Sequence, residues 1–199
     1  MGGNIIRTLH EDQTGIIWVG TDGGGLNKFD PATEQFTRYQ NDVNNPSSLS
    51  SNSVWDIYED RDGVLWIGAY WSGGLDAFDR NTEQFTHYRS NPDDPDSLWS
   101  GQGIKVIRED QAGKLWIGTD GGGLNVFDRK TNTFKHYVND PNNPLSLGHN
   151  TVTAICEDHT GTLWIGTYGG GLQIFDRAAE QFTRDTLDPD HPQSLGDNN

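Results

Sequence analysis

The chain has 199 residues, in which 14 Lys and Arg stand against 29 Asp and Glu, for a formal net charge of −15 at pH 7. A chain this acidic has no basic surface to neutralise phosphates, so nucleic acid and anionic membranes are excluded as partners. The hydrophobic fraction is only 32%, but 7 Trp, 6 Tyr and 8 Phe are too many aromatic residues for a disordered acidic polymer. We therefore expect a folded chain whose core is built mainly from aromatic side chains.

The single cysteine, Cys156, excludes an internal disulfide framework and a cysteine-rich zinc site. No apolar run approaches the roughly 18 residues of a membrane span, so no direct membrane insertion is expected. Residues 1–4 lack the basic and apolar regions of a signal peptide, so no export signal is expected in this chain.

The chain is a tandem repeat of four units, expected at residues 4–51, 52–101, 102–149 and 150–199. Each unit carries a Gly-x-x-Trp segment, a Phe-Asp pair, a second aromatic segment and a Pro/Asn/Asp-rich loop that ends in Ser-Leu. The repeated tryptophans are spaced 48, 50 and 48 residues apart, at Trp18, Trp66, Trp116 and Trp164. A recurring period of this size is the signature of a repeat architecture.

The second unit shows the elements expected in every unit, in chain order. An apolar strand at 54–59 runs into Glu-Asp, and a turn with Gly63 leads to a second strand at 64–68. A Gly-rich turn leads to a third strand at 74–79, and a short turn leads to a fourth at 85–88. Four short strands in a unit of this length predict a propeller blade. The predicted fold is all-β, a β-propeller with four four-stranded antiparallel blades in the chain.

The phase of the repeat bears on how the propeller closes. The chain begins at the repeat position of Asn4, equivalent to Asn52, and ends with a spare Ser-Leu loop at Ser194-Leu195. Because these ends are complementary in sequence, we expect a head-to-tail homodimer that closes an eight-bladed ring. A self-closed ring of four blades and an open arc cut from a longer repeat region are the alternatives.

The longest repeated motif reads Glu-Asp-x-x-Gly-x-Leu-Trp-Ile-Gly-Thr-x-Gly-Gly-Gly-Leu, and it is clearest at 109–124. It recurs at 157–172 and 11–26, and more loosely at 59–75. This motif resembles the two-component regulator propeller repeat. The resemblance implies the periplasmic sensor region of a membrane-bound, often hybrid, histidine kinase, and many such sensors are implicated in detecting glycan fragments. It therefore implies a non-catalytic periplasmic sensor module with a small carbohydrate as its ligand.

Most of the repeated residues have a structural interpretation. The large apolar faces of the repeated Trp and Phe are expected to pack blade against blade. These residues are Trp18, Trp66, Trp116, Trp164, Phe29, Phe78, Phe127 and Phe175. The triple glycines resemble a phosphate cradle, but a strand rather than a helix follows them, so a tight turn is expected. The Asp and Asn pairs lack the spacing of a calcium loop, so neither a metal site nor a cofactor is expected.

The candidate ligand-binding residues are those where one unit departs from the others. The second unit has Tyr70 and Trp71 in a turn one residue longer than in units one and three, and Trp99 in an outgoing loop that is also one residue longer. In a propeller these segments share the face around the channel mouth, so the three rings predict an aromatic platform for a sugar or an aromatic ligand. A loop that covers only itself is the alternative. Tyr168, at the turn position that holds aspartate in units one and three, is a further candidate.

A second divergent set lies four residues before Glu-Asp in each unit, at Arg7, Trp55, Lys105 and Thr153. The first strands of propeller blades line the central channel, so Arg7, Trp55 and Lys105 are candidates for ligand contact. Two cations there would suit a carboxylate or a sulfate. Pairing of the cations with Asp56 or with neighbouring carboxylates is the alternative.

The leading functional hypothesis is a sensor or ligand-binding propeller that is not an enzyme. One alternative is a purely structural or engineered self-assembling propeller segment without a ligand. The other is an enzyme similar to the streptogramin lyases, whose propellers have related Trp-containing repeats. Such an elimination needs a positioned general base and a metal, and His149 and His159 are candidates by residue type only.

Overall fold

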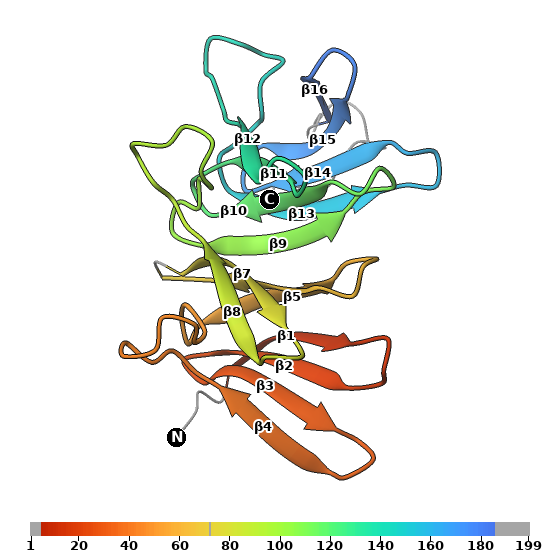
Figure 1. Cartoon of the computed structure of the whole chain (residues 1–199). Coiled ribbons are helices and arrows are strands. Elements are labelled where there is room, and N and C mark those ends of the chain that lie inside the picture. The colour runs from red at the N-terminus through yellow and green to blue at the C-terminus, as the bar shows by residue number, and fades with distance from the viewer. Residues whose placement is uncertain (1–4, 72, 186–199) are drawn as a thin grey trace.

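The computed structural model describes residues 5–71 and 73–185, and all regular structure in this part of the chain is β-strand. The strands form four separate four-stranded sheets (Figure 1). The predicted all-β propeller with four antiparallel blades is therefore confirmed. The loop at Ser194-Leu195, on which the closure argument depends, lies outside the described residues.

Each blade is a meander of four consecutive strands. The first blade comprises β1 (Ile5–Glu11), β2 (Ile17–Asp22), β3 (Gly25–Asp30) and β4 (Gln35–Tyr39). The second comprises β5 (Val54–Glu59), β6 (Leu65–Ala69), β7 (Gly74–Asp79) and β8 (Gln84–Tyr88). The third comprises β9 (Ile104–Glu109), β10 (Leu115–Thr119), β11 (Leu124–Asp128) and β12 (Thr133–Tyr137). The fourth comprises β13 (Val152–Glu157), β14 (Leu163–Thr167), β15 (Gly171–Asp176) and β16 (Gln181–Asp185).

The blades follow one another in chain order around the inner edge of the molecule. The first strands β1, β5, β9 and β13 contact one another in sequence, and the fourth strands lie at the outer edge (Figure 1). Because neighbouring sheets twist apart toward the outside, large side chains are needed to fill the space between them. The repeated aromatic residues meet this need.

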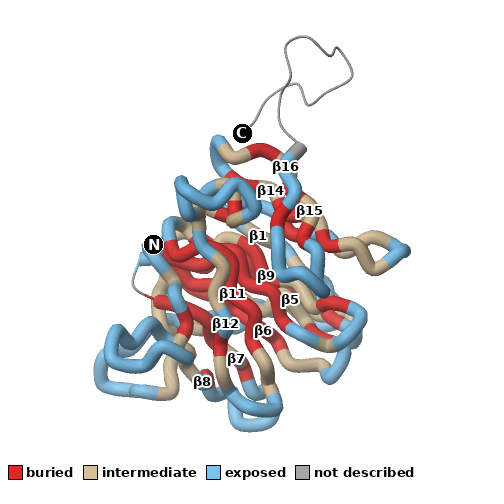
Figure 2. Tube along the Cα trace, turned by 90° about the horizontal axis from the view of Figure 1, so that it is seen from above, coloured by how far each residue is buried: buried red, intermediate tan, exposed pale blue. Residues whose placement is uncertain are grey.

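The core consists of interfaces between neighbouring blades. Trp18 meets Phe78 of the second blade edge-on at 5.4 Å between ring centroids, and the same contact joins each following pair of blades. Buried leucine and isoleucine residues surround these rings, and Figure 2 shows buried residues concentrated along the central strands. Two of the predicted packing residues belong to the end blades and do not pack between described blades. Phe29 packs on Phe36 of its own blade at 4.6 Å between ring centroids, and Trp164 has no described aromatic neighbour.

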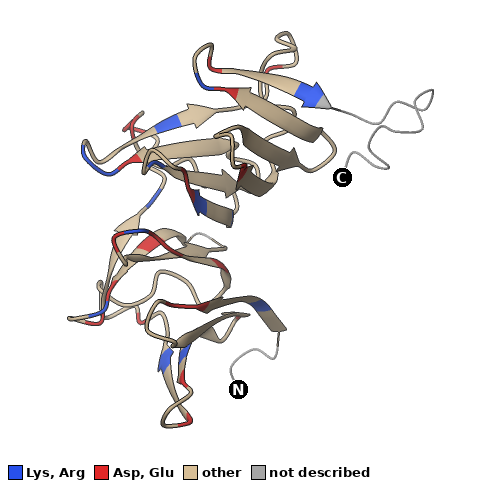
Figure 3. Ribbon diagram, turned by 90° about the vertical axis from the view of Figure 1, so that its right-hand side faces the viewer, with Lys and Arg blue, Asp and Glu red and all other residues tan. Residues whose placement is uncertain are grey.

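The two end faces of this stack are not packed against each other. On the first blade Ile6, Leu9 and Phe36 are 59%, 63% and 68% exposed, whereas their counterparts in the later blades are buried. On the fourth blade Trp164 and Leu172 are partly exposed. The described residues therefore form an open arc of four blades (Figures 1 and 3), and closure by a second chain stays a prediction.

Candidate functional site

The turns between second and third strands lie beside the loops that lead into the next blade. Single β-bridges join these segments at Asp22 and Ser53, at Tyr70 and Gly103, and at Asp120 and Thr151. The backbone N–H of Trp71 also donates to the Gln102 carbonyl at 3.0 Å. The two loops that are lengthened in the second unit are therefore in contact. We call this edge of the blades the channel mouth.

A β-bulge interrupts each blade at the divergent position of its first strand. In the first blade Ile6 pairs with Thr21 and Thr8 with Gly20, which leaves Arg7 outside the ladder. The same register shift leaves out Trp55, Lys105 and Thr153 in the other blades. A bulge breaks the strict alternation of side chains and re-aims the residue that it carries. Three of these bulge residues converge on one cluster.

Trp55 lies at the centre of this cluster. Tyr70 stacks on its ring at 4.2 Å between centroids, with an angle of 13° between the ring planes. The guanidinium of Arg7 lies 4.3 Å from the Trp55 ring centroid, and the ammonium of Lys105 lies 4.7 Å from it. Cations over an indole ring are attracted by its electron-rich face. Side chains from three blades thus meet around one indole.

Both cations are paired with carboxylates of the channel mouth. Arg7 donates to Asp22 Oδ2 at 2.6 Å, and Lys105 Nζ lies 3.5 Å from Asp120 Oδ2. Asp56 instead pairs with Arg108, at 3.0 Å. Of the two interpretations from sequence, the contacts agree with pairing to neighbouring carboxylates, and the partners are Asp22 and Asp120. The cluster therefore has no net charge.

Tyr70 ties the aromatic pair to the charges. Its hydroxyl donates to Asp120 Oδ2. Burial and this hydrogen bond to a carboxylate raise the pKa of Tyr70 to about 12. Burial also raises the pKa of the Asp120 carboxyl, but hydrogen bonds from Tyr70 and Thr151 outweigh this effect, so the pKa of Asp120 is lowered. Both shifts keep Tyr70 protonated and Asp120 charged at neutral pH.

Trp71 is the exposed ring of the cluster. It is 62% exposed and meets Tyr70 edge-on at 4.9 Å between centroids. Its backbone adopts φ +55°, a left-handed conformation that bulky residues rarely take. Such strain persists where the surrounding structure imposes it and is common at binding sites. With Tyr70 buried and Trp55 covered by Tyr70 and Arg7, Trp71 offers the accessible aromatic face at this point.

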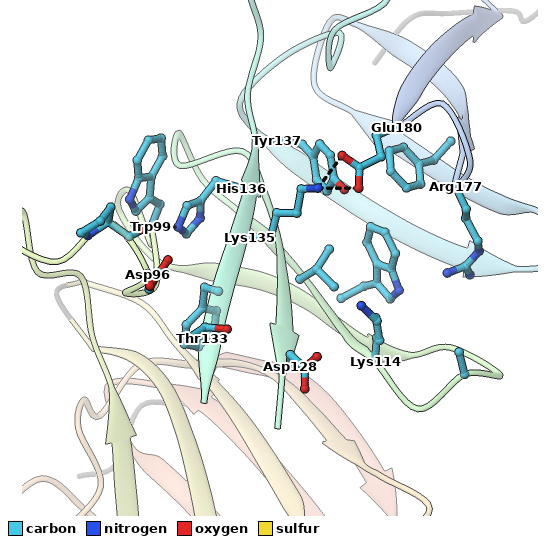
Figure 4. Close-up of a pocket in the computed structure, with 16 residues that line it drawn as sticks. Asp96, Trp99, Lys114, Asp128, Thr133, Lys135, His136, Tyr137, Arg177 and Glu180 are labelled. Atoms are coloured by element: carbon cyan, nitrogen blue, oxygen red, sulfur yellow. Dashed lines mark hydrogen bonds and ion pairs between the residues drawn. The ribbon is translucent and has the colours of Figure 1, made fainter. Parts of the chain in front are cut away.

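Trp99 does not join this platform. Its ring stacks on His136 at 4.3 Å between centroids, nearly parallel, and it is 41% exposed. The backbone N–H of Trp99 donates to Asn125 Oδ1 at 2.9 Å, which fixes the loop against the third blade. Trp99 and His136 line a cavity of about 880 Å³ at the outer edge of blades three and four. Figure 4 shows them on one side of β12, with Lys135, Tyr137 and Glu180 on the other.

The remaining candidates lie in or next to the fourth blade. Tyr168 is 62% exposed and has His149 as a ring neighbour at 6.2 Å. His149 precedes β13 and His159 follows it, so the two histidines lie at opposite ends of one strand. No group of three or more metal-ligating side chains is present in the described residues.

Comparison with known proteins places this propeller in a family. The family model described as two component regulator propeller matches residues 1–23, 48–71, 94–121 and 146–169. The extracellular domain of the hybrid two component system BT3049 from B. thetaiotaomicron is 31% identical in sequence, with a TM-score of 0.77. That alignment covers 92% of this chain and 24% of the other. The chain belongs to the two component regulator propeller family and spans about a quarter of the length of that relative.

More distant structures share the fold alone. PorZ, a surface component of the type-IX secretion system of Porphyromonas gingivalis, is 17% identical, with a TM-score of 0.72 over 98% of this chain and 28% of its own. An auxiliary nutrient binding protein from Bacteroides thetaiotaomicron is 12% identical, with a TM-score of 0.61 over 92% of this chain and 41% of its own. No curated protein matches the chain. The described residues include no helix that is long and apolar enough to cross a membrane.

Sequence reasoning missed the carboxylates Asp22 and Asp120. Each holds the turn position that Tyr70 and Tyr168 hold in the even-numbered blades. Each also accepts a hydrogen bond from a hydroxyl of the next blade, Ser53 or Thr151. The signal that could have found them is the alternation of Asp and Tyr at one repeat position, in step with the cations at the bulges.

Proposed function

We propose that the chain is a non-catalytic sensor module of a two component regulator, located outside the cytoplasmic membrane, that binds a small neutral carbohydrate at the channel mouth. The family and the relative at 31% identity support a propeller of the sensor type. The ligand, its site and the location are our inference.

The observation that carries the proposal is the convergence of divergent residues. Arg7, Trp55 and Lys105 occupy one repeat position in three blades, and each is re-aimed by a bulge. They surround or contact Tyr70, which in turn contacts Trp71, and both of these residues belong to a turn that is lengthened in one blade only. Repeated residues build the blades, so residues that break the repeat and still cluster are the best candidates for recognition.

The chemistry of the cluster favours a neutral sugar. An exposed indole such as Trp71 stacks on the apolar face of a pyranose ring, while nearby polar groups bond its hydroxyls. Asp22 accepts and Arg7 donates, so both kinds of partner lie at the mouth. An anionic ligand would have to displace a carboxylate from Arg7 or Lys105, which a neutral ligand need not do.

Binding at this site would link three blades. Ligand contacts to the first, second and third blades at once would bias how these blades pack, and a downstream module could read that change. This is a binding mechanism in which the ligand favours one packing of the blades over another.

The proposal is tested by titrating the chain with neutral disaccharides and with the matching uronic-acid disaccharides. The readout is the set of indole N–H signals in proton–nitrogen NMR spectra. We expect a neutral sugar to shift the Trp71 and Trp55 signals, and Trp71→Ala to weaken binding about tenfold or more, as for an aromatic anchor residue. Trp99→Ala is the matched control, since Trp99 is also an exposed ring in a lengthened loop.

Equal losses from Trp71→Ala and Trp99→Ala would move the site away from the channel mouth. The absence of binding by any sugar of the panel would instead favour the alternative of a purely structural, self-assembling propeller. Preference for the uronic acids would contradict the neutral ligand and return the cations to the role of anion contacts.

A further inference from the structure

The three junctions between described blades share one set of contacts, which we call the junction latch. An arginine directly after the third strand of the later blade bridges an aspartate of the earlier blade and a glutamate of its own. Arg80 donates to Asp12 at 2.6 Å and to Glu59 at 2.7 Å. Arg177 donates to Asp110 at 2.6 Å and to Glu157 at 2.8 Å, and Arg129 bridges Asp60 and Glu109 in the same way.

Hydrogen bonds within its own blade fix the aspartate of the latch in position. Asp12 accepts the backbone N–H groups of Thr14 and Ile16 on one carboxylate oxygen and the Trp18 indole N–H on the other, at 2.7 Å. The arginine comes to that second oxygen, Oδ2. Asp12, Asp60 and Asp110 are all buried. A buried carboxylate that lacks a cation is costly, so the latch ties each blade to a neighbour that supplies one.

The fourth blade carries the receiving half of the same latch. Asp158 accepts the backbone N–H groups of Thr160 and Thr162 and the Trp164 indole N–H, at 2.9 to 3.0 Å. No lysine or arginine of the described residues lies within ion-pair distance of it. Trp164, which donates to it, and Leu172 of the same blade are partly exposed, whereas their counterparts in the other blades are buried.

We propose that this face of the fourth blade is an interaction surface for another propeller blade, one that carries an arginine directly after its Phe-Asp third strand. The arginine would complete the latch on Asp158, and the phenylalanine would cover Trp164 as Phe78 covers Trp18. Charge complementarity selects the partner, because three junctions of the chain use the same pair of charges.

The first blade of a second copy does not meet this requirement. It offers Phe29 and Glu11, but Pro31 stands where the other blades have arginine. The turn itself has the same geometry as in the second blade. Ala32 N–H donates to Asp30 at 2.8 Å, as Asn81 N–H donates to Asp79. Glu34 has φ +57°, and its counterpart Glu83 has φ +55°. Only the cation is missing, so a single substitution turns this blade into the stated partner.

The test mixes two versions of the chain. The donor combines Pro31→Arg with Asp158→Asn, so that its first blade supplies an arginine and its fourth blade cannot receive one. A fluorophore is attached to the donor at the exposed Cys156 of the fourth blade. The acceptor is the unlabelled natural chain. We expect fluorescence anisotropy to show binding about tenfold or more tighter than for a donor that keeps Pro31.

Two controls separate the latch from a general charge effect. Ala32→Arg with Asp158→Asn moves the new cation by one residue and should bind no better than the Pro31 donor. Asp158→Asn in the acceptor should remove the gain that Pro31→Arg gives to the donor. Equal binding by all donors, no complex with any of them, or a gain that survives Asp158→Asn in the acceptor would each overturn the proposal, provided that thermal melts show every variant folded.

Discussion

At the scale of single residues, equivalent positions in different blades act as internal references for one another. His87 and His136 hold the same place in the second and third blades, and each lies beside the proline of the preceding loop. His87 faces Asp76, whose side chain is buried, at 2.7 Å, whereas His136 faces the neutral Asn125 at 2.9 Å. The hydrogen bond to Asp76 raises the pKa of His87, while burial lowers the pKa of His136.

This contrast predicts how stability depends on pH. A histidine whose pKa is raised by folding stabilises the fold fully below its unfolded pKa, and that stabilisation is lost as pH rises through the folded pKa. The free energy of unfolding should therefore fall as pH rises above the ordinary histidine value of 6.5. Urea unfolding at a series of pH values measures this slope, and NMR titration should show His87 releasing its proton at a higher pH than His136.

Asp76→Asn gives His87 the same partner side chain that His136 has in the third blade. The variant should lower the pKa of His87 and flatten the dependence of stability on pH above 6.5. An unchanged pKa in Asp76→Asn would assign the shift to another group, although Arg89 nearby acts in the opposite direction.

At the scale of elements, the triple-glycine turn shows which glycines the blade requires. Gly123 has φ +81°, and a Cβ there would lie 2.4 Å from the carbonyl oxygen of Tyr137. Gly121 has φ +93°, but a Cβ there would meet no atom within 4 Å. The first glycine therefore serves only the backbone conformation, and the last also allows the close approach of the neighbouring strand.

We predict unequal losses when these glycines are replaced. Gly121→Ala should lower the free energy of unfolding by about 1 kcal/mol, the cost of a left-handed alanine. Gly123→Ala should lower it by about 3 kcal/mol, because the strain is added to a clash with backbone that cannot rotate away. Urea denaturation of both variants measures the difference, and equal losses would show that the strand next to Gly123 moves aside.

At the scale of the whole molecule, the arc leaves one face of the first blade uncovered. Leu9 on this face is 63% exposed, and its counterpart Ile57 in the second blade is 4% exposed. Alanine substitution at each of the two positions therefore reports whether another blade covers this face in solution.

For the chain alone, Leu9→Ala should change the free energy of unfolding by about 0.5 kcal/mol or less, as is usual for exposed residues. Ile57→Ala should cost about 3 kcal/mol, as for a buried aliphatic side chain. If the predicted head-to-tail homodimer forms, Leu9→Ala should cost nearly as much as Ile57→Ala and should reduce the mass measured by light scattering. A mass near 22.1 kDa with a small effect of Leu9→Ala would contradict the homodimer.

The sequence by itself determined the blades. Each strand, turn and packing residue of a blade depends mainly on contacts within one repeat and its neighbour. Four copies of the sequence pattern therefore predict the same blade structure four times. Comparison of the four repeats also singled out positions at which one repeat differs from the others. These positions are Arg7, Trp55, Lys105, Tyr70 and Trp71.

Only the tertiary structure decided what these departures do. The bulges that re-aim Arg7, Trp55 and Lys105 are single-residue register shifts, which leave no clear trace in a short strand. The sequence predicted that Trp99 joins Tyr70 and Trp71, because its loop is also lengthened. Its ring instead stacks on His136, because the loop packs against the third blade. The pairing of charges across blades likewise follows from the rotation between neighbouring sheets, because contacts between blades join residues about 50 or 70 positions apart in the chain.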